Sequence, residues 1–211
     1  MPDHTVVLLH GLGRSPVSFW RMRIMLNEAG FALMAPGYLA LRAGHGALSD
    51  GLEGKLPENG RIDFVGHSLG GLLALRLMDR LAPERRGRIV QLGAPNLGSE
   101  TAIKARRLGP LVGPSLEELE PHDEPHTVRP DLLAVAGTAA PEALGRVTGL
   151  TGPNDGLVEV ESALAVALPE NQLILPVTHT LMMMDKRVIE ATMDFLTTGA
   201  LDPARAASGY K

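Results

Sequence analysis

Cysteine is absent from the 211-residue sequence, which excludes disulfides, thiolate metal ligands and a cysteine nucleophile. Aromatic residues make up only 3%, so any core is built mainly from aliphatic side chains. Basic residues are not in excess either, since the formal net charge is −4 at pH 7. Nucleic-acid binding needs a basic face that neutralises phosphates. We therefore expect no nucleic-acid partner.

Long hydrophobic runs are also lacking. The N-terminal segment "MPDHTVVLLHGLG" has no basic region, and its apolar stretch is too short for a signal peptide or a membrane helix. We expect a cytoplasmic protein without stable membrane insertion. With 45% hydrophobic and 21% charged residues, the composition is that of a globular chain. The length and the lack of a linker predict a single domain over 1–211, with a tail at 202–211 that frays.

Short apolar runs alternate with longer segments of helical period. Continuous apolar runs of four to six residues are typical of parallel strands buried on both faces. Three segments have clear helical period, and a weaker one spans Gly46–Leu56. This alternation predicts a three-layer α/β/α fold with a mainly parallel sheet of about six strands. The predicted strands are Thr5–Leu9, Ala32–Ala35, Ile62–Val65, Ile89–Leu92, Leu132–Ala136 and Leu173–Val177; the clearer helices are Val17–Ala29, Gly70–Leu81 and Asp185–Leu196.

The segment "IDFVGHSLGG" places Ser68 between a predicted strand and a predicted helix. Gly-x-Ser-x-Gly in this context is a nucleophile elbow, a sharp turn that raises the serine hydroxyl above the end of the sheet. Glycines two residues before and after the serine allow the strand and the helix to approach closely. We predict that Ser68 is a nucleophile.

A serine nucleophile needs a base, and the base needs an acid that orients it. Asp155 lies in the turn "GPNDG" after the fifth predicted strand, and His179 follows the sixth. The order Ser, Asp, His is the chain order expected after a nucleophile elbow. Glu159 and Glu161 are alternatives to Asp155, although their alternation with valines favours an exposed strand or edge face.

The loop "HGLGRS" after the first predicted strand is rich in glycine and can turn backbone N–H groups toward the serine. We expect the N–H groups of Leu12 and Leu69 to form an oxyanion hole. His67 lies inside the elbow and is expected to point away from the serine hydroxyl. His10 follows the first predicted strand. Four other histidines lie in irregular polar stretches and are expected to be exposed: His4, His45, His122 and His126.

The segments "VVLLHGLGRSP", "FVGHSLGG", "QLGAPNLGSE", "PNDGLV" and "LPVTHT" together resemble the α/β-hydrolase superfamily, particularly small bacterial lipase- and esterase-like members. The resemblance implies a Ser68–Asp155–His179 triad, an acyl-enzyme on Ser68, and chemistry without a metal or organic cofactor. It implies a small-molecule ester or lipid as substrate. The sequence has room for only a minimal cap, in Gly98–Pro130 or Gly37–Gly60, and no large cap domain.

Thioester cleavage or acyl transfer would use the same three residues, and a binding module without turnover is a further alternative. The segment "PHDEPH" at 121–126 could suggest a metal cluster, but its two prolines favour a polar loop. Met182–Met184 directly follows the predicted base. Methionine fills irregular apolar gaps, so we expect core packing there rather than a wall of the acyl pocket.

Overall fold

The computed structural model describes residues 4–41, 43–99, 101–102, 119, 127–140 and 148–202. Within these ranges six strands form one sheet in the order β2-β1-β3-β4-β5-β6, and every neighbouring pair is parallel. The predicted six-stranded parallel sheet is confirmed. The strands are β1 (His4–Leu9), β2 (Leu33–Met34), β3 (Arg61–His67), β4 (Arg86–Leu92), β5 (Leu132–Gly137) and β6 (Gln172–Leu175).

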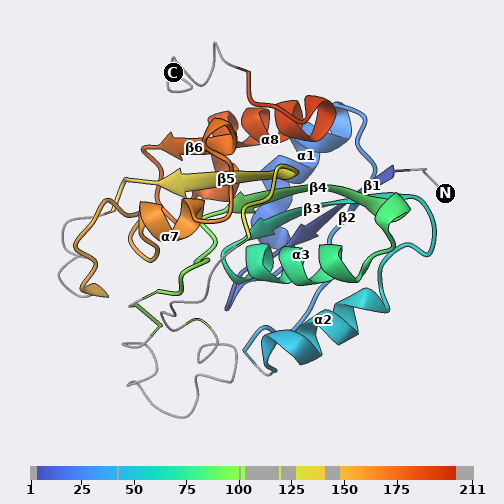
Figure 1. The fold of residues 1–211 in the computed structure, drawn as a ribbon, viewed down its shortest axis with the longest axis horizontal. Helices are drawn as coiled ribbons and strands as arrows, with labels where there is room; N and C mark the ends of the chain where they lie inside the picture. The colour runs from blue at the N-terminus through green and yellow to red at the C-terminus, as the bar shows by residue number, and fades with distance from the viewer. Residues whose placement is uncertain are drawn as a thin grey trace.

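Helices cover both faces of this sheet (Figure 1). On one face lie α1 (Trp20–Glu28) and α8 (Lys186–Thr198); on the other lie α3 (Leu69–Arg80) and the short α7 (Val160–Leu164). The helix α2 (His45–Glu53) packs against α3, and Arg80 of α3 bonds Asp50 and Glu53 of α2. The predicted three-layer arrangement is confirmed.

The strands are apolar on both faces because each face has its own core. Val7, Leu9 and Phe64 belong to the cluster under α3, whereas Val6 and Leu8 point to the cluster under α1 and α8. All five side chains are at most 1% exposed. Burial of one large aliphatic side chain contributes roughly 1.5–3 kcal/mol, so these continuous apolar runs stabilise both layers at once.

The helix boundaries follow local chemistry. The predicted helix Val17–Ala29 begins as a 3₁₀ turn, η1 (Pro16–Phe19), and continues as α1. Asp185 caps α8 by accepting the N–H of Arg187 at 2.9 Å, and Gly199 ends that helix with a φ of 81°. The cap satisfies an N–H group that the first helical turn leaves without a partner.

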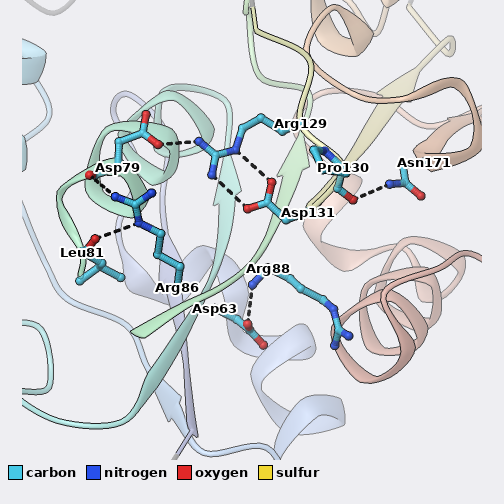
Figure 2. A network of polar contacts seen from close by, with 9 residues as sticks. All are labelled: Asp63, Asp79, Leu81, Arg86, Arg88, Arg129, Pro130, Asp131 and Asn171. Atoms are coloured by element: carbon cyan, nitrogen blue, oxygen red, sulfur yellow. Dashed lines mark hydrogen bonds and ion pairs between the residues drawn. The ribbon is translucent and has the colours of Figure 1, made fainter. Parts of the chain in front are cut away.

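Polar side chains join the elements at the amino ends of the strands (Figure 2). The buried Asp63 of β3 accepts the backbone N–H of Arg88 in β4 at 2.6 Å. Arg129 donates to Asp131 at 3.0 and 3.1 Å, and to Asp79 of α3 at 2.6 Å. These bonds hold β3, β4, α3 and the start of β5 together at the end of the sheet opposite the nucleophile elbow.

Among the described residues, no helix combines the length and apolar character that crossing a bilayer requires.

Candidate active site

Ser68 lies at the sharp turn between β3 and α3. Its φ of 54° and ψ of −124° make it the sole described non-glycine residue with positive φ. Such a conformation costs a side-chain-bearing residue on the order of 1–3 kcal/mol, and it persists only where the surroundings impose it. The structure thus places Ser68 in the strained turn that the sequence predicted.

Two glycines make this turn possible. A Cβ atom at Gly66 would lie 2.3 Å from the carbonyl oxygen of Gly70, and one at Gly70 would lie 2.1 Å from the carbonyl oxygen of Leu9. Both distances are far below van der Waals contact with rigid backbone. Gly66 and Gly70 therefore bring the start of α3 directly against β3 and the end of β1.

Asp155 and His179 form a buried hydrogen-bonded pair. Oδ2 of Asp155 lies 2.8 Å from Nδ1 of His179, and the two residues are 2% and 5% exposed. The other carboxylate oxygen accepts the N–H groups of Leu157 at 3.0 Å and Val158 at 2.8 Å. Because an ionised carboxylate only accepts, Nδ1 of His179 carries the proton and Nε2 is left as the acceptor.

The backbone fixes the same pair. The N–H of His179 donates to the carbonyl oxygen of Asp155 at 3.0 Å, so two hydrogen bonds join these residues. Gly93, directly after β4, lies against them: a Cβ there would be 2.9 Å from Oδ2 of Asp155 and 3.1 Å from Nδ1 of His179. This glycine sets how closely β4 approaches the pair.

Glu159 holds the loop that leads to Asp155. Its Oε1 accepts the N–H groups of Thr151 at 3.1 Å and Gly152 at 3.2 Å. The expected exposed strand at Glu159 and Glu161 is wrong, because Glu159 is the N-cap residue of α7 and Glu161 lies in that helix. Alternation with valines over four residues fits one turn of helix as well as a strand.

The loop after β1 packs against the elbow. A Cβ at Gly11 would lie 3.0 Å from the Cβ of Ser68, and the N–H of Arg14 donates to the carbonyl oxygen of Gly11 at 3.2 Å. Leu69 is the first residue of α3, where N–H groups have no partner within the helix. Within the described parts of the chain, neither the N–H of Leu12 nor that of Leu69 donates to a protein acceptor.

These groups surround a cavity of about 280 Å³. Ser68, His179 and Leu12 all line it, so two of the three predicted catalytic residues share one cavity, and Asp155 lies behind His179. The wall is mainly apolar. Its other described residues are Arg14, His67, Pro95, Ser99, Thr101, Ala102, Leu119, Leu157 and Val158.

His67 has a contact that sequence reasoning missed. Its ring is 1% exposed, and Nε2 donates to the backbone carbonyl of His179 at 2.9 Å. Burial, followed by the nearby His179, lowers the pKa of His67 well below its usual range. His67 is therefore neutral near pH 7 and acts as a donor to the segment carrying His179. Its position next to Ser68 was the only signal in the sequence.

His10 starts the loop after β1 and is buried. Its ring stacks on Tyr38 with centroids 3.9 Å apart, and the Tyr38 hydroxyl donates to the carbonyl of His10. Burial lowers the pKa of His10, against a smaller opposing effect of the Gly11 carbonyl, and burial raises the pKa of Tyr38. Both groups are uncharged near pH 7, so they stabilise the loop by packing.

The expectation of exposed histidines is wrong for His45, which is 1% exposed at the start of α2. His4 is half-buried, and its Nε2 lies 2.6 Å from Oδ2 of Asp63. His122 and His126, together with the rest of 121–126, lie outside the described residues. Within the described residues, no three His, Asp or Glu side chains gather in a way that could hold a metal ion.

The Met182–Met184 segment forms a 3₁₀ turn, η4, whose first two methionines are at most 1% exposed in the core under α1 and α8. The prediction of core packing is confirmed. Of the two segments considered for a cap, 37–60 folds around α2 and packs on α3. Most of 98–130 lies outside the described residues, although Ser99, Thr101, Ala102 and Leu119 line the cavity.

Similar folds occur in several solved structures. Phospholipase PlaB from Legionella pneumophila is 16% identical with a TM-score of 0.66; the match covers 98% of this chain and 56% of PlaB. A pyrethroid hydrolase from Sphingobium faniae JZ-2 is 13% identical with a TM-score of 0.62, covering 96% and 99%. The metagenomic carboxyl esterase MGS0156 is 22% identical with a TM-score of 0.57, covering 85% and 65%. No protein-family model and no curated protein matches the sequence.

The parallel sheet, the elbow after β3 and these neighbours define the class: the chain has the α/β-hydrolase fold. At identities of 13–22% the similarity establishes the fold and leaves the reaction to be argued from the site.

Proposed function

We propose that the protein is a serine hydrolase that cleaves carboxylic esters through an acyl-enzyme on Ser68. The observation that carries the proposal is that a strained serine and the histidine of a buried Asp–His pair line one cavity. Neighbours with the same fold include a phospholipase and a carboxyl esterase, and these descriptions favour esters over other acyl compounds.

In the first half-reaction, Oγ of Ser68 attacks the acyl carbon while Nε2 of His179 accepts its proton. Asp155 holds the ring through Nδ1–H and stabilises the imidazolium that forms. The N–H groups of Leu12 and Leu69 donate to the oxyanion, assisted by the positive end of the α3 dipole. His179 then protonates the leaving alcohol as its bond to the acyl carbon breaks.

In the second half-reaction, water attacks the acyl-enzyme and His179 accepts its proton. Collapse of the second tetrahedral intermediate breaks the acyl–Ser68 bond, releases the acid and returns the proton to Ser68. No metal or organic cofactor takes part in these steps. We therefore expect hydrolysis to be insensitive to EDTA.

The test measures hydrolysis of 4-nitrophenyl esters from acetate to dodecanoate. It compares the wild-type protein with the Ser68→Ala variant and with a control variant, Ser18→Ala. We expect turnover that falls at least about 10⁴-fold in Ser68→Ala, by analogy with other triad enzymes, and stays unchanged in Ser18→Ala. The chain-length profile separates an esterase from a lipase. A thioester series and an added alcohol acceptor test thioester cleavage and acyl transfer in the same assay. A folded protein that hydrolyses none of these compounds would support a binding module instead.

A further inference from the structure

The cavity wall holds one permanent charge among its described residues. Of the twelve side chains that line it, only the Arg14 guanidinium is ionised at all working pH values. Two of the other eleven are His67 and His179, and the remaining nine are apolar or hydroxyl side chains. A single cation in an apolar wall is a strong determinant of which substrates bind.

Among the described residues, no side chain neutralises this charge. Arg14 is exposed, and within the described parts of the chain its guanidinium makes no ion pair or hydrogen bond. Other arginines differ: Arg80, Arg129 and Arg187 each bond a carboxylate at 2.6–2.7 Å. The carboxylate of Asp155 is also not available to Arg14, because it bonds His179 and two backbone N–H groups.

The backbone places Arg14 close to the reaction centre. It lies two residues beyond Leu12, and its N–H closes the turn onto Gly11, which packs against Ser68. Its positive charge also contributes to the lowered pKa of His67, although burial is the main cause. Arg14 is exposed and lines the cavity, which puts it where the cavity opens to solvent, whereas Leu119 and Val158 in the apolar wall are buried.

We propose that the substrate is an ester between an apolar acyl chain and an alcohol that carries a carboxylate or phosphate, which Arg14 binds. The inference rests on the proposed function and adds the substrate class. An apolar acyl chain is stabilised by the buried wall, whereas an anion keeps part of its hydration at the exposed mouth. Guanidinium donors match carboxylate and phosphate oxygens in a bidentate geometry. Arg14 binds the alcohol portion and takes no part in proton transfer.

The test compares two butyrate esters that share an acyl chain: one of 3-hydroxybenzoate and one of its neutral methyl ester. Each kcat/KM is divided by the rate of alkaline hydrolysis, which removes the difference between the leaving groups. We expect a preference of about 10-fold for the anionic ester, typical of an exposed charge-assisted contact. That preference should weaken between 10 and 300 mM NaCl.

Variants of Arg14 test whether its side chain causes the preference for the anionic ester. Arg14→Gln should abolish it, and Arg14→Lys should keep part of it because the charge remains while the bidentate geometry is lost. Arg23→Gln is the matched control, since Arg23 is an exposed arginine of α1 without an ion pair among the described residues and outside the cavity. It should leave the preference unchanged.

Further substrates separate the alternatives. A 3-(phosphonooxy)phenyl butyrate distinguishes phosphate from carboxylate, and the phenyl monoester of adipate moves the anion to the acyl chain. Hydrolysis of the neutral ester without an Arg14-dependent preference would overturn this inference and leave the proposed function standing. A preference confined to the adipate monoester would overturn the placement of the anion on the alcohol. Failure to hydrolyse any ester would overturn the proposed function itself.

Discussion

Gly93 lies against both members of the Asp155–His179 pair, and replacing it with alanine tests the pair's geometry directly. The new Cβ would lie 2.9 Å from Oδ2 of Asp155 and 3.1 Å from Nδ1 of His179. Ordinary contacts of a Cβ begin at about 3.4 Å, so the acid and the base must each move by a few tenths of an ångström. The 2.8 Å hydrogen bond between them would then lengthen or tilt.

A misplaced base is costly. Displacements of about 1 Å can lower turnover about 100-fold, and loss of the acid's orienting hydrogen bond lowers it about 10⁴-fold. We expect kcat of Gly93→Ala to fall at least about 30-fold on a butyrate ester. Alanine at the φ of 59° also costs roughly 1–2 kcal/mol of folding free energy, which urea unfolding measures.

Gly30→Ala is the matched control. Gly30 follows α1 with a φ of 89°, and a Cβ there would have no heavy atom within 4 Å. Gly30→Ala should lose a similar amount of folding free energy and keep wild-type kcat. It shares the backbone strain with Gly93→Ala but makes no contact with Asp155 or His179. Folded Gly93→Ala with more than a third of wild-type kcat would refute the reasoning. An equal loss of kcat in Gly30→Ala would show that strain, rather than contact with the pair, lowers turnover.

Three further changes have defined outcomes. Asp155→Asn should lower kcat about 10⁴-fold in a folded protein, measured on a nitrophenyl ester. Its amide oxygen takes the two backbone N–H bonds, so its NH₂ group faces Nδ1 of His179 and forces the proton onto Nε2; near-normal kcat would contradict this. As the pH is lowered below about 6.5, the free energy of unfolding should decrease by up to about 1.4 kcal/mol per pH unit. The reason is that the unfolded state protonates His67 while the native state does not. Urea unfolding at several pH values should show a flatter slope for His67→Gln, and an unchanged slope would exclude His67 as the cause. Asp185→Ala removes the cap of α8 and should cost about 1 kcal/mol, or about 2–4 °C in Tm, with unchanged kcat; an unchanged Tm would mean that the cap contributes nothing.

Much of the fold could be predicted from the sequence because its signals are local. Apolar runs of four to six residues define the strands, and the glycines around Ser68 fix the elbow. The strand predicted at Ala32–Ala35 is shorter in the structure, where only Leu33 and Met34 pair as β2. This strand lies at the edge of the sheet, so a single neighbouring strand supplies its hydrogen bonds. Pattern alone does not reveal how many residues an edge strand pairs.

Other features depend on contacts between distant segments. Glu159 accepts the N–H groups of Thr151 and Gly152 only because the chain turns back between them, just before α7. Two glutamates that alternate with valines do not predict these bonds. His45 is buried at the start of α2, and α2 packs on α3; a weakly periodic, glycine-rich stretch predicts neither. The bond from His67 to the His179 carbonyl spans 112 residues, so it could not be read from the elbow motif.

The most direct test of the account is labelling with a fluorophosphonate, which reacts with activated serine nucleophiles. The folded protein, the same protein unfolded in urea, and Ser68→Ala are incubated with the probe, and adducts are located by mass spectrometry. We predict one adduct per folded chain, on Ser68, and none in the other two samples. No adduct on Ser68 in a protein that is folded by circular dichroism would contradict the proposed nucleophile.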